Sequence, residues 1–86
     1  MIREQLMEIA DDEELLFADG FDDAIIGVGN RCGQPPVIVY DRDKCIEILE
    51  ARGMDLEQAE EYFAFNVAGA WIGDRTPMFV TRPKET

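Results

Sequence analysis

The chain has 86 residues, of which 47% are apolar, and its 19 acids against 8 bases give a net charge of −11. One hydrophobic core fits this length, and the apolar content excludes a disordered chain, so we expect a single domain over residues 1–86. The strong acidic balance argues against direct binding to nucleic acid or to anionic membranes, since both would repel the chain.

The acids concentrate at the N-terminus. Nine acids and one base, Arg3, fall within the first 23 residues, so this stretch carries −8. The acids are Glu4, Glu8, Asp11, Asp12, Glu13, Glu14, Asp19, Asp22 and Asp23. We divide the domain into an acidic helical segment over residues 1–20 and an α+β core over residues 21–82.

The apolar spacing predicts a helix over residues 2–17, with Leu6 and Ile9 on its buried stripe. The acidic run 11–14 allows two interpretations. It is either the exposed face of one long helix or a break, at which one of its aspartates caps a second short helix. Gly20 ends this region.

Two strands are predicted next, over residues 21–29 and 36–40, because both stretches are rich in β-branched residues. Turn-forming residues at 30–35 join them into an antiparallel hairpin. The isomer of the peptide bonds at Pro35 and Pro36 stays open, since either could be cis.

Two capped helices follow. Asp41 is the expected N-cap of the first helix, and Gly53 is its expected stop. Asp55 and Gln58 have the spacing of a complete capping box, which predicts the start of the second helix.

The second helix has two adjacent apolar rows, and this predicts burial over a wide face. The first row is Leu56, Ala59, Phe63 and Val67, and the second is Tyr62, Phe65 and Ala68. Glu57, Glu60 and Glu61 then lie outside.

A turn at residues 74–77 precedes a last strand over residues 78–81, so the element order is α-β-β-α-α-β. This order favours an α+β fold: a small, three-stranded, mostly antiparallel sheet packed by helices on one face. If the third strand lies beside the first, the two run antiparallel.

The chain has few residues that could act in catalysis, because it contains no histidine and no serine. Cys32 and Cys45, expected to be reduced and half-buried, lack an imidazole that could activate them, and they cannot form a zinc site alone. The carboxylate pairs Asp22–Asp23 and Asp41–Asp43 could hold Mg²⁺, but surface or capping roles are favoured. We therefore expect no enzyme activity, no metal and no cofactor.

The glycines at residues 27–33 do not form a nucleotide-binding loop. The sixth position of that fingerprint is Cys32 here, and a strand rather than a helix follows.

The acidic segment is the most informative surface. Acids at helical spacing lie roughly 5–6 Å apart, so such a face could imitate the phosphate rows of a DNA duplex and occupy a basic groove on another protein. The alternative is a solvated helix face that keeps a small protein soluble.

Residues 21–80 resemble a family of small, mostly uncharacterised proteins of tailed bacteriophages and prophages. The resemblance is carried by GQPPVIVYD at 33–41, by DLEQAEEYFAFNVAGAWIG at 55–73 and by TPMFV at 76–80. It implies a setting, a phage protein that acts in a bacterial cytoplasm, and it implies no catalytic site.

The leading hypothesis is a non-enzymatic inhibitor or modulator of a host protein with a basic surface, such as a defence or nucleic-acid-handling factor. This would make the chain an anti-CRISPR-like or DNA-mimic-like protein that binds through the acids of its first 23 residues. The alternative is a homo-oligomeric module, for instance a homodimer, or a small-ligand-binding module, which uses the aromatic surface around Tyr62, Phe65 and Trp71. Neither hypothesis involves a membrane or direct contact with nucleic acid, and no apolar run approaches the roughly 20 residues that a membrane-spanning helix needs.

Overall fold

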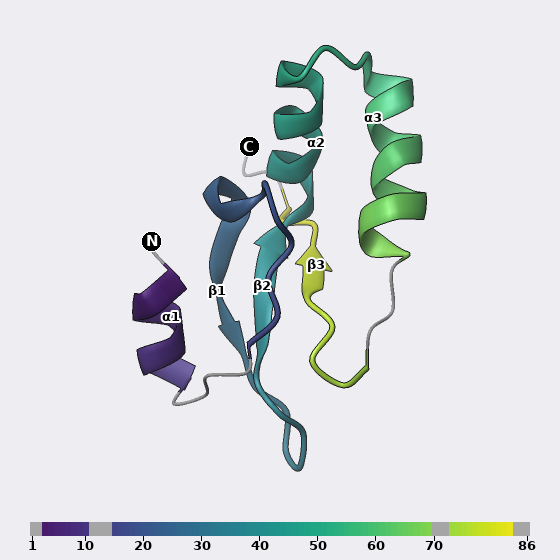
Figure 1. Ribbon diagram of the computed structural model, residues 1–86. Coiled ribbons are helices and arrows are strands. Elements are labelled where there is room, and N and C mark those ends of the chain that lie inside the picture. The colour runs from purple at the N-terminus through teal and green to yellow at the C-terminus, as the bar shows by residue number, and fades with distance from the viewer. Residues whose placement is uncertain (1–2, 11–14, 70–72, 84–86) are drawn as a thin grey trace.

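A computed structural model of the chain describes residues 3–10, 15–69 and 73–83 (Figure 1). Its elements are α1 (Arg3–Ala10), a 3₁₀ helix η1 (Asp22–Ala24), β1 (Ile25–Gly29), β2 (Val37–Asp41), α2 (Arg42–Ala51), α3 (Leu56–Tyr62), a π-helix η2 (Phe63–Ala68) and β3 (Met78–Val80). This order confirms the predicted α+β fold with its α-β-β-α-α-β sequence. None of the described helices is long and apolar enough to cross a bilayer.

The sheet has the order β1-β2-β3, so β2 is its central strand. β1 and β2 form the predicted antiparallel hairpin, whereas β3 pairs with β2 in parallel. The sheet is therefore mixed, and the idea that the third strand lies beside the first is wrong. A parallel pair needs a crossover of a dozen or more residues, which the two helices between β2 and β3 provide.

The hydrophobic core joins all of these elements. Its buried members are Leu6, Leu15, Phe21, Ala24, Ile38, Tyr40, Cys45, Ile46, Leu49, Ala59 and Phe63. Figure 1 shows α1 beside β1, and α2 and α3 side by side at one end of the sheet. Phe79 of β3 lies half-buried between two core rings, 5.3 Å from the centroid of Tyr40 and 5.0 Å from that of Phe63.

The prediction of a helix as far as residue 17 is wrong beyond residue 14. α1 ends at Ala10, residues 11–14 lie outside the described part of the chain, and residues 15–18 have no helical structure. Leu15 is buried, and the backbone N–H of Ala18 donates a 2.7 Å hydrogen bond to the hydroxyl oxygen of Tyr40. The segment thus lies across the sheet because core contacts and this hydrogen bond replace the bonds of a helix (Figure 1).

Both predicted helix starts are confirmed. The Asp41 side chain accepts hydrogen bonds from the backbone amides of Asp43 and Lys44. Asp55 and Gln58 form the reciprocal capping box. Gly53, with φ of 104°, supplies the left-handed residue that ends α2.

The wide buried face predicted for the second helix is wrong. In its first row Ala59 and Phe63 are buried, although Leu56 is exposed. In its second row Phe65 is 81% exposed and Tyr62 is 41% exposed. The backbone changes to a π-helix at Phe63, so Phe65 and Ala68 no longer follow the α-helical spacing from which the second row was predicted.

Gly69 ends the π-helix, where a side chain would not fit. A Cβ atom at this position would lie 2.7 Å from the carbonyl oxygen of Ala64.

The described residues contain no cis peptide bond, so the bonds at Pro35 and Pro36, whose isomer the sequence left open, are both trans.

Candidate functional site

The structure describes five of the nine acids proposed for partner binding. Glu4 and Glu8 are exposed on α1, Asp19 lies in the loop before η1, and Asp22 and Asp23 begin η1. The remaining four, Asp11, Asp12, Glu13 and Glu14, lie outside the described residues.

Arg3 gathers two of these acids. Its guanidinium donates to both carboxylate oxygens of Asp22, with the shortest distances at 3.0 Å, and to Asp19 at 3.1 Å. The same guanidinium lies 4.6 Å from the ring centroid of Phe17. Arg3 therefore ties α1 to the loop and to η1, and it holds one acid from each of these two segments.

The other described acids of the segment keep their charge uncompensated. In the described residues Glu4, Glu8 and Asp23 take part in no ion pair, and even the bridged Asp19 has a side chain that is 94% exposed. Glu4 and Glu8 lie one helical turn apart, so both project from the same side of α1. Of the predicted acidic surface, the five described acids are thus exposed, and two of them are paired with Arg3.

Two hollows adjoin this surface and together form what we call the aromatic groove. The first, of about 240 Å³, lies between residues 17–21 and the α3–η2 helix, and β3 contributes Phe79 to it. The second, of about 410 Å³, runs along the outer side of α3. Both are lined by Tyr62 and Asn66, so the two hollows lie on either side of these residues, one with Asp19 and the other with Phe65.

Sequence reasoning found only part of this groove. Tyr62 and Phe65 were predicted as an aromatic surface and Asp19 as part of the acidic one, yet the structure brings the two surfaces together. Glu61, Gln58 and the other lining residues were missed as binding residues. The sequence did contain a signal for Glu61. No lysine or arginine occurs between Gly53 and Asp74, so the three glutamates of this helix have no cation nearby in the chain. Trp71 lies outside the described residues.

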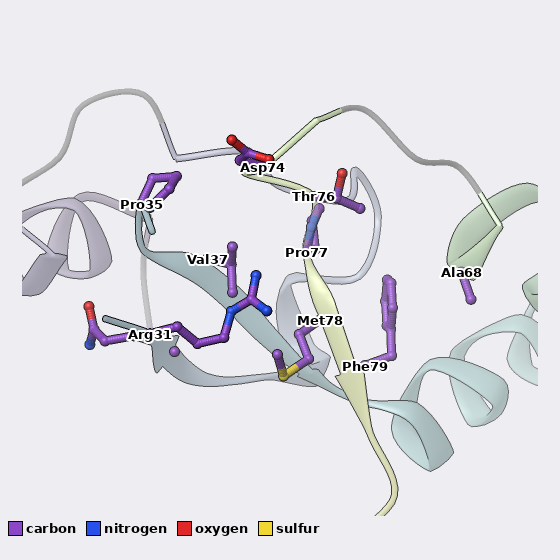
Figure 2. Close-up of a pocket in the computed structure, with 11 residues that line it drawn as sticks. Arg31, Pro35, Val37, Ala68, Asp74, Thr76, Pro77, Met78 and Phe79 are labelled. Carbon is purple, nitrogen blue, oxygen red and sulfur yellow. The ribbon is translucent and has the colours of Figure 1, made fainter. Parts of the chain in front are cut away.

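A third hollow, of about 570 Å³, lies where the loop of the hairpin meets β3 (Figure 2). Its lining is mostly apolar, and the guanidinium of Arg31 reaches toward Val37 and Met78 across it. Arg31 forms no ion pair within the described residues. Asp74 also lines the hollow, whereas none of the nine proposed acids does.

Of the candidate catalytic and metal-binding groups, Asp22, Asp41 and Cys45 are engaged or buried, whereas Asp23 and Cys32 are exposed. Asp22 is held by Arg3, and Asp41 caps α2 while it accepts a 2.7 Å bond from Arg82. The described residues contain no group of three side chains that could hold a metal ion. Cys45 is buried as a small apolar residue would be, whereas Cys32 is exposed, contrary to the prediction that both are half-buried.

Comparison of the chain with protein-family models, with curated proteins and with solved structures finds no match.

Proposed function

We propose that the protein is a non-enzymatic binding protein that inhibits or modulates a host protein with a basic surface. The carrying observation is the set of exposed, unpaired carboxylates of Glu4, Glu8 and Asp23, next to the exposed Asp19. An acidic surface attracts a basic partner over several ångströms before contact, which raises the association rate and favours such partners over acidic ones.

The setting of this proposal is a bacterial cytoplasm during phage infection. It is supported by the resemblance of residues 21–80 to small phage proteins. A host factor that binds nucleic acid or serves in defence has the basic groove that such a surface would occupy, as an anti-CRISPR-like or DNA-mimic-like inhibitor does.

The test begins with affinity capture from bacterial lysate and mass spectrometry, and then uses the purified partner. We compare the double variant Glu4→Gln/Glu8→Gln with the control Glu47→Gln/Glu50→Gln, which removes two exposed glutamates from α2 instead. We expect the first pair to lower the association rate constant severalfold more than the control does. We also expect affinity to fall as salt is raised from low concentration to about 0.15 M.

An equal effect of the two double variants would contradict the proposal, because it would show that net charge alone matters. Affinity that does not change with salt would do the same. A third variant with Asp11, Asp12, Glu13 and Glu14 changed to Asn or Gln extends the test to the rest of the segment.

A second candidate function is self-association through the aromatic surface. It is favoured by the 81% exposure of Phe65, since large apolar side chains on a surface often mark an interface. Sedimentation velocity decides this candidate: a dimer that becomes a monomer on Phe65→Ser supports it, and a monomeric native chain rejects it.

A further inference from the structure

The described aromatic rings differ in what they pack against. Phe17, Phe21 and Phe63 each have an arginine above the ring, at centroid distances of 4.6, 5.2 and 5.6 Å. Tyr40 and Phe79 pack against other rings. Among the described rings only Tyr62 and Phe65 have neither kind of partner, and both line the outer hollow of the aromatic groove.

The same helix has carboxylates without cations. Glu57, Glu60 and Glu61 are exposed and form no ion pair in the described structure. Glu61 lines the hollow together with Tyr62 and Phe65, so one open site combines a carboxylate with two ring faces. Gln58 and Asn66 add amide groups at its margin.

The backbone presents these rings in an unusual way. Phe65 lies in the π-helix Phe63–Ala68, a conformation that is rare and that frequently occurs at functional sites. The π-helix keeps Phe63 in the core while Phe65 stands in solvent, where an isolated apolar ring is unfavourable unless a partner covers it.

We propose that the aromatic groove seats an arginine side chain of the protein partner, with its guanidinium stacked on Tyr62 and Phe65 and bonded to the Glu61 carboxylate. This inference rests on the proposed function in that the partner is basic, and it assigns the residue that the partner inserts. The chain itself uses this chemistry, because Arg3 both stacks on Phe17 and bonds two carboxylates.

Arginine fits this site better than lysine does. A guanidinium is planar, so it stacks on a ring while its edge N–H groups donate to a carboxylate, whereas an ammonium is a compact and strongly hydrated charge. Tyr62 also lines the neighbouring hollow that contains Asp19, so a basic segment of the partner that inserts this arginine would pass close to an acid of the N-terminal segment.

The probe is a short acetylated and amidated peptide with a single arginine flanked by glycines. Matched peptides have lysine, or citrulline, which keeps the shape of arginine without its charge. Binding is followed by two-dimensional NMR of the full chain through the ring resonances of Tyr62 and Phe65. We expect the arginine peptide to shift these resonances, the lysine peptide to shift them less and the citrulline peptide to leave them in place.

Three variants test the geometry. Phe65→Leu keeps an apolar side chain without the ring, and we expect roughly two- to fivefold weaker binding of the arginine peptide. We expect a comparable loss for Glu61→Gln and none for the control Glu47→Gln on α2. Phe65 and Glu61 are exposed, so these changes leave the core intact.

Equal binding of arginine and citrulline peptides would overturn the inference, as would equal losses for Glu61→Gln and Glu47→Gln. A dimer that Phe65→Leu dissociates would also overturn it, because a second copy of the chain would then occupy the groove. If the purified partner loses affinity for Glu4→Gln/Glu8→Gln but not for Phe65→Leu, the arginine site fails while the proposed function stands. If the arginine peptide binds but affinity for the partner does not change with salt, the arginine site stands while the proposed function fails.

Discussion

Cys45 lies near the start of α2 with its side chain fully buried, and burial, together with the nearby charge of Asp41, raises the pKa of its thiol to about 11. A thiol must ionise before it reacts as a nucleophile, so this cysteine is inert near neutral pH. Cys32 has the same chemistry in a different environment, since it is exposed in the hairpin loop.

We predict that a thiol reagent modifies one cysteine of the native protein and both cysteines after unfolding in guanidinium. The reason is that unfolding exposes Cys45 to solvent and restores its ordinary pKa. Absorbance of the released chromophore counts the reactive thiols. In the variant Cys32→Ser the native protein should not react, and rapid reaction of that variant would contradict the buried position of Cys45.

At the scale of elements, Asp41 connects the end of β2 to the start of α2. Burial opposes ionisation of its carboxyl group, but the hydrogen bonds from Arg82 and from the backbone amides of Lys44 and Asp43 outweigh that effect and lower its pKa below the ordinary 3.8. One carboxylate thus holds the central strand, the following helix and Arg82, two residues after β3, together.

The lowered pKa makes the contribution of Asp41 depend on pH. A carboxyl group whose pKa is lower in the folded state stabilises the fold above its unfolded pKa, and this stabilisation is lost as pH falls through the folded pKa. We therefore predict that the free energy of unfolding in urea decreases below about pH 4. Asp41→Asn, which can still cap α2, should show a smaller decrease over the same range.

The variant Asp41→Ala tests the cap itself. It should lower the free energy of unfolding at neutral pH by about 0.5–2 kcal/mol, the usual range for the loss of an N-cap. Glu50→Gln, which removes an exposed carboxylate from the same helix, is the control.

The pH prediction has its own contradicting outcome. Equal pH profiles for the native chain and Asp41→Asn would show that Asp41 does not cause the loss of stability in acid.

At the scale of the whole molecule, the net charge of −11 acts on a chain of only 86 residues. Arg3, Arg42 and Arg82 form ion pairs in the described structure, and their side chains are 37–66% exposed. Exposed pairs of this kind stabilise a fold weakly, so repulsion among the unpaired acids outweighs them.

We predict that added sodium chloride raises the melting temperature of the isolated protein, because salt screens this repulsion. A gain of about 1 kcal/mol corresponds to roughly 4–8 °C in a domain of this size, so a rise of a few degrees is expected. Calorimetry or circular dichroism measures it, and choline chloride serves to exclude specific sodium binding. A fall in melting temperature would show that the ion pairs dominate.

The sequence by itself determined the features that neighbouring residues control. The caps at Asp41 and Asp55, the stop at Gly53, the hairpin and the order of the elements all depend on side chains within a few positions of the backbone groups that they satisfy.

Only the tertiary structure decided which segments lie next to one another. It placed β3 beside β2, drew residues 15–18 across the sheet instead of into a helix, left Phe65 in solvent and brought Asp19 to Tyr62. Each of these outcomes depends on contacts between residues far apart in the chain, where competition for the same buried surface overrides local preference.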